Sequence, residues 1–159
     1  MNNLSFNEID QVSCVECIEY FPLKVVFDPS FGGNHFIGFY GGDNNLLEFT
    51  VSSANTVKRL QVVSCKNYEI IDSNFAPPHP AQSGCINLNY PQHNDCDSFK
   101  MSVYTDCIDI RISTKSATKY YAMSQVMFGM DDNEELVSLI ITNLSHEEIA
   151  HTIFELQAD

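Results

Sequence analysis

The chain has 159 residues, of which 44% are hydrophobic and 11% aromatic, a composition typical of a folded globular domain and not of a disordered one. This length suits a single domain covering residues 1–159. The net charge of −13 makes nucleic acid and anionic membranes poor partners, because both require clustered Lys and Arg. A basic protein is the partner that this charge favours.

The acidic residues concentrate toward the two ends of the chain. Residues 1–23 carry four acids and no Lys or Arg, and residues 120–159 carry eight acids and again no base. Residues 24–119 hold the other nine acids and all eight bases, and are nearly neutral. Because chain ends are often close in space, the pattern predicts one coherent acidic face.

The sequence also suggests where the protein works. No run is long and apolar enough to span a bilayer, and residues 1–8 lack the basic and then apolar pattern of a signal peptide. We therefore expect a cytoplasmic protein. The six cysteines are then expected to be reduced thiols, several of them buried; they are Cys14, Cys17, Cys65, Cys85, Cys96 and Cys107.

The first half of the chain reads mainly as short strands. Residues 1–19 are ambiguous between a short helix and an irregular lead-in, and alternation predicts a strand over 19–27 followed by a loop over 28–34. Two apolar runs, 35–40 and 46–51, flank a glycine-containing turn and predict a hairpin. Runs 57–64 and 67–71 suggest a second strand pair.

The region 73–97 is rich in Pro, His and Asn, and we expect a long loop insertion with at most a short strand near 85–89. Period-two alternation then predicts a hairpin from strands 99–104 and 108–113, which turns at Thr105-Asp106. A longer strand over 118–127, a turn over 129–133 and a buried strand over 136–142 follow.

A C-terminal helix starting at Ser145 is the clearest local prediction. Ser145 and Glu148 form an S-x-x-E capping box, and Leu144 and Ile149 occupy the positions of a hydrophobic staple. Apolar residues at helical spacing would let the helix pack on a sheet. The predicted fold class is α+β, a mostly antiparallel sheet of about eight to ten strands with this helix packed on it.

The sequence offers few candidates for chemistry. Cys14 and Cys17 form a CxxC, but no second CxxC or HxxxH completes a zinc site. His146 and His151 are five residues apart, so they point to different sides of a helix and do not form a zincin motif. We expect no enzymatic activity, no cofactor and no metal, while a ligand- or zinc-binding accessory domain that uses the cysteines stays open as the alternative.

Four carboxylates in the turn before the last strand are the first candidates for a binding site: Asp131, Asp132, Glu134 and Glu135. Their spacing lacks the glycine and terminal glutamate of an EF-hand, so calcium is not expected. Asp106 and Asp109, which we expect nearby, are second candidates for partner binding. Tyr120 and Tyr121 are candidate aromatic anchors.

A small, strongly acidic α+β chain with the C-terminal pattern from Glu134 through Ser145 to Glu148 resembles bacterial immunity proteins of polymorphic toxin systems, such as those of contact-dependent growth inhibition. The resemblance implies tight binding to one cognate toxin domain, often a basic nuclease. It implies neutralisation by an acidic face that covers the toxin's cationic cleft. These immunity proteins share no catalytic residues, so the resemblance transfers no site.

Overall fold

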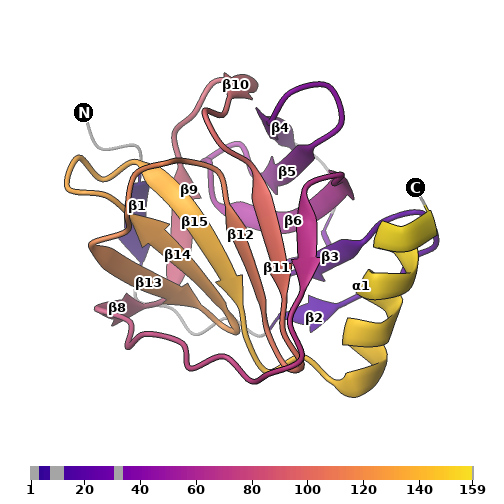
Figure 1. Ribbon diagram of the computed structural model, residues 1–159. Coiled ribbons are helices and arrows are strands. Elements are labelled where there is room, and N and C mark those ends of the chain that lie inside the picture. Colours follow the sequence, from indigo (N-terminus) through magenta and orange to yellow (C-terminus); the bar gives the residue numbers. More distant parts are fainter. Residues whose placement is uncertain (1–3, 8–12, 31–33, 159) are drawn as a thin grey trace.

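The computed structural model describes residues 4–7, 13–30 and 34–158, and Figure 1 shows the arrangement of their elements. The elements in chain order are β1 (Leu4–Asn7), β2 (Cys14–Val15), β3 (Leu23–Val26), β4 (His35–Tyr40), β5 (Leu46–Val51), β6 (Val57–Ser64), β7 (Tyr68–Ile70), β8 (Gln82–Ser83), β9 (Cys85–Leu88), β10 (His93–Asp95), β11 (Lys100–Val103), β12 (Ile108–Arg111), β13 (Lys119–Met123), β14 (Val126–Met130), β15 (Leu136–Ile141) and α1 (His146–Ala158). The described residues form mostly strands and one C-terminal helix, which confirms the α+β class.

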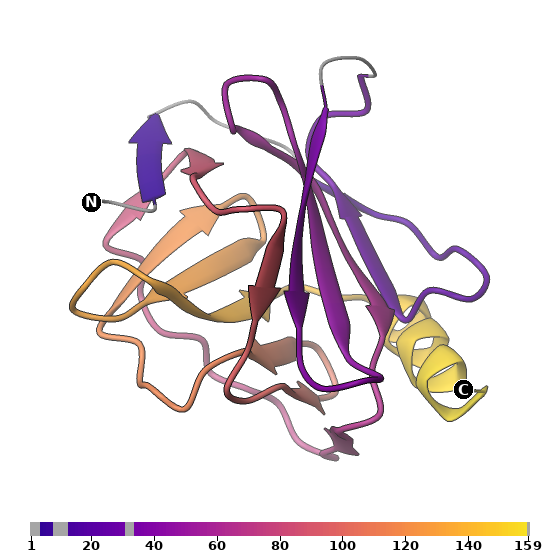
Figure 2. The same ribbon diagram turned by 90° about the horizontal axis from the view of Figure 1, so that it is seen from above.

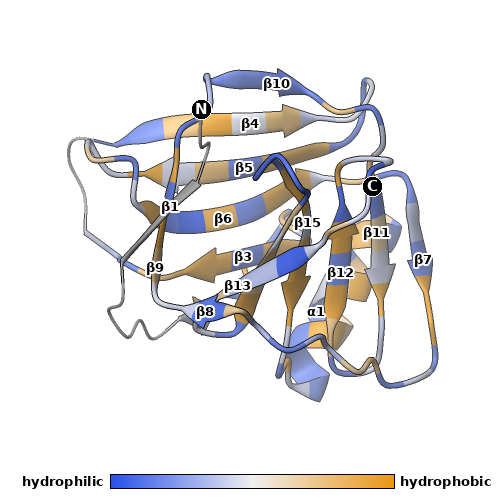
Figure 3. Ribbon diagram, turned by 90° about the vertical axis from the view of Figure 1, so that its left-hand side faces the viewer, coloured by the Kyte–Doolittle hydropathy of each residue, from blue (hydrophilic) through white to orange (hydrophobic). Residues whose placement is uncertain are grey.

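The strands form two large mixed sheets that pack face to face. One has the order β10-β4-β5-β6-β3-β2 and the other the order β7-β11-β12-β15-β14-β13-β8. β1 and β9 form a separate antiparallel pair. Figure 3 shows the strands of the two large sheets crossing steeply, as in an orthogonal sandwich.

The core lies between the facing sides of the two sheets. Alternate residues of each strand point inward, so Phe49 and Leu47 of β5 meet Phe128 and Leu139 from the opposite sheet, and all four are fully buried. The rings of Phe49 and Phe128 lie 6.1 Å apart between centroids. The burial of apolar side chains on both sheets therefore determines which face of each strand is exposed.

Most of the predicted strands are present. β4 and β5 pair over 35–40 and 46–51 as expected, with His35 opposite Val51. β11 and β12 form the predicted hairpin, and β15 coincides with the predicted buried strand.

Two strand pairings differ from the prediction. β7 does not pair with β6: after Cys65 the chain leaves the six-stranded sheet, and β7 pairs in parallel with β11 of the other sheet. We predicted a single strand over 118–127. This segment instead contains β13, a turn at Ser124-Gln125 and the start of β14, and the two strands pair as a hairpin. Ser124 adopts a φ of 55°, a turn conformation that is usually occupied by Gly, Asn or Asp, so a Ser at this position does not predict the turn.

The structure has more strands than the eight to ten that we predicted, because several strands of two or three residues lie at sheet edges. The region 73–97 contains two of these short strands, β8 and β10, together with the four-residue β9, which coincides with the short strand that we expected there. β8 borders the seven-stranded sheet and β10 the six-stranded sheet. Two or three residues are too few to show an alternating pattern.

The helix begins as predicted. The backbone N–H of Ser145 donates to Glu148 Oε1 at 2.8 Å, and the N–H of Glu148 donates to Ser145 Oγ at 3.1 Å, which completes the capping box. Ile149 and Leu156 of α1 join the core. Figures 1 and 2 both show α1 beside β2 and β3, at one edge of the sandwich. Within the described ranges, no helix combines the length and apolarity that crossing a bilayer needs.

Candidate functional site

The turn between β14 and β15 is held by the carboxylate of Asp131. Asp131 Oδ1 accepts hydrogen bonds from the backbone N–H of Asn133 at 2.9 Å and of Glu135 at 3.0 Å. The N–H of Glu134 donates to the Asp131 carbonyl at 3.0 Å, which closes the turn. Asp131 is 7% exposed, whereas Asp132 and Glu135 are exposed. The predicted set therefore contains one side chain that shapes the turn and others that face solvent.

Lys115 connects this turn to the loop that follows β12. Its ammonium lies 3.6 Å from Asp131 Oδ2 and 3.5 Å from Glu135 Oε2. Burial raises the pKa of the Asp131 carboxyl, but the two backbone N–H groups and Lys115 outweigh burial, so the net pKa is below its usual value. The two carboxylates in turn raise the pKa of Lys115, Glu135 first. Asp131 is therefore ionised at neutral pH.

A second acidic segment reaches the same end of the sandwich from β10. Asp97 accepts hydrogen bonds from the hydroxyl of Thr114 at 2.8 Å and from its backbone N–H at 3.1 Å, and these bonds lower the pKa of Asp97. Asp95 lies 2.9 Å from the Nε2 atom of His93, whose ring stacks on Tyr40 at a centroid distance of 4.2 Å. Asp97 thus fixes the 112–118 loop, while Asp95 stays exposed.

These segments surround a groove of about 290 Å³. Its apolar lining comes from both sheets and consists of Phe39, Tyr90, Ile112 and Leu136. Its charged lining comprises Asp95, Asp97, Glu135 and Lys115. The Tyr90 hydroxyl accepts a hydrogen bond from the N–H of Leu136 at 2.8 Å, which ties the start of β15 to the segment before β10.

We call this region the acidic end; it is defined by Asp95, Asp97, Asp131, Asp132, Glu134 and Glu135. The bases beside it are Lys115 and Lys119, the latter opposite Met130 at the start of β13. Of the six carboxylates, those of Asp131 and Glu135 lie within ion-pair distance of Lys115. An apolar floor with a negative rim is chemically suited to a cationic side chain with an aliphatic stem, such as Arg or Lys.

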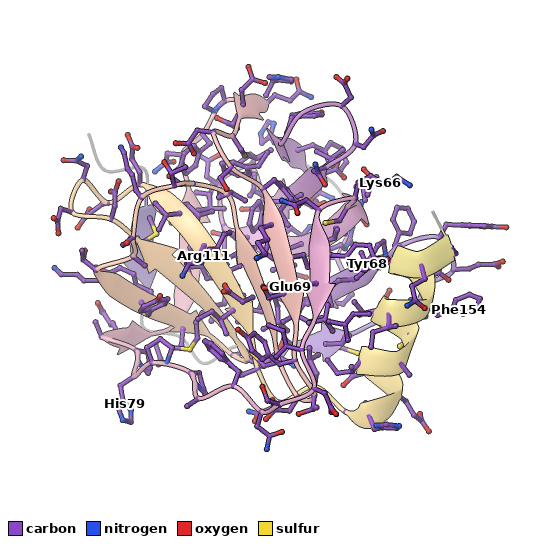
Figure 4. The ribbon with its side chains drawn as sticks, viewed as in Figure 1. Lys66, Tyr68, Glu69, His79, Arg111 and Phe154 are labelled. Atoms are coloured by element: carbon purple, nitrogen blue, oxygen red, sulfur yellow. The ribbon has the colours of Figure 1, made fainter. Side chains whose placement is uncertain are left out.

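Asp106 and Asp109, the second candidates for partner binding, do not lie at the acidic end. Asp106 lies at the opposite end of β15, where its carbonyl accepts from the N–H of Leu144 at 3.0 Å. Six residues of strand separate it from the acidic end, roughly 20 Å. Asp109 lies on the open face of the seven-stranded sheet, 3.7 Å from the Nε atom of Arg111. Burial raises the pKa of Asp109, partly offset by Arg111. Figure 4 shows Arg111 on this face, together with Glu69.

The two tyrosines point to opposite sides of their sheet. Tyr121 packs against the main core, and Tyr120 packs on the outer face against a smaller cluster of Cys107, Met127 and Ile140. Successive residues of a strand alternate in this way. Tyr120 and Tyr121 therefore cannot contact one partner surface together.

The acids of the two chain ends meet in part beside α1, but they do not form the single face that we predicted, because the turn over 131–135 lies elsewhere. β1 lies on the far side of the molecule from α1 (Figure 1), and two of the N-terminal acids, Glu8 and Asp10, fall outside the described residues. Glu16 and Glu19 belong to the loop before β3, beside α1. The negative charge is divided between the acidic end and the helix side of the protein.

The cysteines are dispersed. Cys14 and Cys17 are exposed, while Cys65, Cys85 and Cys107 are buried. Burial, followed by nearby carboxylates, raises the pKa of Cys96 to about 11 and of Cys107 to about 12, so neither is a ready nucleophile at neutral pH. Among the residues whose positions are described, no group of three or more His, Cys, Asp or Glu is arranged to hold a metal ion.

Sequence reasoning missed Asp95, Asp97 and Lys115 as members of the site. The hydrogen bond between Asp97 and Thr114 joins residues that are 17 positions apart, and no local sequence pattern predicts it. No protein-family model matches this sequence, and no curated protein matches it significantly.

Proposed function

We propose that this chain is a binding protein that neutralises a basic partner protein, and that the partner contacts the acidic end. The observation that carries the proposal is the convergence of carboxylates from two separate segments, 95–97 and 131–135, around one groove with an apolar floor. The resemblance to immunity proteins of polymorphic toxin systems makes a toxin domain, often a basic nuclease, the partner of choice. The site of action is then the cytoplasm.

Occlusion is the proposed mechanism. A cationic side chain of the toxin enters the groove, where its aliphatic part packs on Phe39 and Tyr90 and its charge meets Asp95 and Glu135. The exposed carboxylates around the groove cover the positive cleft that would otherwise hold substrate phosphate. Charge complementarity of this kind accelerates association and selects against wrong partners.

The test is co-expression with the candidate toxin domain, sought in the gene immediately upstream. We expect the toxin domain to arrest growth alone, and this chain to restore growth and to co-purify with the domain as a stable complex. Growth arrest that persists despite soluble expression of this chain would contradict the proposal. A ligand- or zinc-binding accessory domain is the alternative, and stoichiometric zinc that survives dialysis of the purified protein would favour it.

A further inference from the structure

Two aromatic side chains stand out on the helix side of the protein. Tyr20 is 74% exposed and Phe154 is 67% exposed, more than any other large hydrophobic residue that the structure describes. They come from opposite ends of the chain, but the packing of α1 against the loop before β3 places Tyr20 beside Glu155, the residue that follows Phe154. The N–H of Tyr20 donates to Glu155 Oε2 at 3.1 Å, and His151 Nε2 lies 3.1 Å from the carbonyl oxygen of Phe21. Figure 4 shows Phe154 projecting from α1, away from the sheets.

Tyr20 is held in an unfavourable backbone conformation. Its φ is 75°, in the left-handed region that a bulky residue rarely adopts. Such strain persists only when the surroundings impose it. Here Glu155, itself only 6% exposed, provides a charged acceptor for the Tyr20 N–H. This hydrogen bond holds the loop against α1 while the ring of Tyr20 stays exposed to solvent.

Both segments that carry these rings also carry acidic residues. Glu147 in the first turn of α1 and Glu19 in the loop are exposed, and Glu148 is half-buried. Burial, and then the negative charges of Glu148 and Glu147 in α1, raise the pKa of the Cys17 thiol in the loop. Lys24 lies nearby, 3.3 Å from Glu16, and so is partly neutralised. No Lys or Arg occurs in residues 1–23 or 120–159.

We propose that Tyr20 and Phe154, together with the exposed Glu19 of the loop and Glu147 of α1, form a second docking surface that takes an Arg- or Lys-bearing segment of a partner protein. The face of an aromatic ring attracts a cation, and the surrounding carboxylates complement it. A second copy of this chain is a poor occupant, because both copies carry a charge of −13 and would meet through acidic surfaces. This surface is separate from the acidic end, and the proposal does not depend on the function assigned there.

The test is a titration of the ¹⁵N-labelled chain with a short Arg-rich peptide, followed by NMR, with a peptide in which every Arg is replaced by neutral citrulline as its control. The amides of Phe21 and Glu155 report on this surface and remain in all variants. We expect the Arg peptide to shift both signals and the citrulline peptide to leave them in place. Replacing each ring, by Tyr20→Gly or Phe154→Gln, should raise the site-resolved Kd about 2- to 5-fold.

Phe36→Gln is the matched control, because Phe36 is an exposed aromatic on β4, 48% exposed, outside this surface. It should leave the Kd reported by Phe21 and Glu155 unchanged. The proposal is overturned if the Arg peptide shifts only signals of the acidic end, if the ring variants bind as tightly as wild type, or if the citrulline peptide binds equally well. Shifts at Phe21 and Glu155 that appear on raising the protein concentration alone would identify the occupant as a second copy, and would also overturn it.

Discussion

Replacing Asp131 by Ala should destabilise the protein through the turn that supports the acidic end. The substitution removes the acceptor for the N–H groups of Asn133 and Glu135, at 2.9 and 3.0 Å, and leaves Lys115 without one of its two carboxylates. Hydrogen bonds to charged groups contribute about 1.5–3 kcal/mol each, and water can replace part of that in an exposed turn. We therefore expect a loss of about 2–4 kcal/mol in the free energy of unfolding.

The pH dependence of this loss follows from the lowered pKa of Asp131. A carboxyl whose pKa is lower in the folded than in the unfolded protein stabilises the fold fully above the unfolded pKa, near 3.9. That stabilisation disappears as the pH falls through the folded pKa. The difference between wild type and Asp131→Ala should therefore be largest at neutral pH and should shrink in acid.

Urea unfolding of wild type, Asp131→Ala, Asp131→Asn and Asp132→Ala, at neutral pH and at about pH 3, measures these effects. Asn keeps an acceptor oxygen for the two N–H groups, so its loss should be smaller than that of Ala. Asp132 is the exposed neighbour, and its replacement should change stability by less than about 0.5 kcal/mol. An Asp131→Ala variant as stable as Asp132→Ala would refute the role of Asp131 in the turn.

Three further predictions concern the fold around the two surfaces. Ser145→Ala removes one half of the capping box and should lower the free energy of unfolding by about 1 kcal/mol. Ser145→Asp keeps a capping oxygen and should retain most of the wild-type stability, and thermal unfolding compares the two variants. Gly129→Ala should cost about 1–3 kcal/mol in chemical denaturation, because the added Cβ collides with Ser138 Oγ, and an unchanged midpoint would contradict that packing. A thiol reagent at neutral pH should label the exposed Cys14 quickly and the buried Cys107 only on unfolding, as peptide mapping of the labelled protein can show.

Local signals in the sequence were sufficient for the elements that depend on neighbouring residues. The capping box at Ser145 and Glu148, the alternation in β12 and the glycine-containing turn between β4 and β5 each predict their own conformation, because the interactions that form them lie within a few residues. The strand preceding the helix was predicted for the same reason. These elements gave the α+β class correctly.

Pairings between distant segments could not be read in this way. The residues around Tyr68 do not predict that β7 pairs with β11 of the seven-stranded sheet, because the apolar alternation of a strand is the same in either sheet. The same limit applies to the site. The turn containing Asp131 was found from its run of acids, but its connection through Lys115 to Asp97 depends on the packing of both sheets, as does the separation of Asp106 from it.

The salt dependence of association with the toxin domain tests the central claim most directly. Asp132→Lys changes the charge at the acidic end, and Asp72→Lys makes the same change at an exposed turn beyond β7, at the other end of the sandwich. We predict that Asp132→Lys slows association at low ionic strength and flattens its dependence on salt, whereas Asp72→Lys has a clearly smaller effect on both. Equal association rates and equal salt dependence for the two variants would contradict binding through the acidic end.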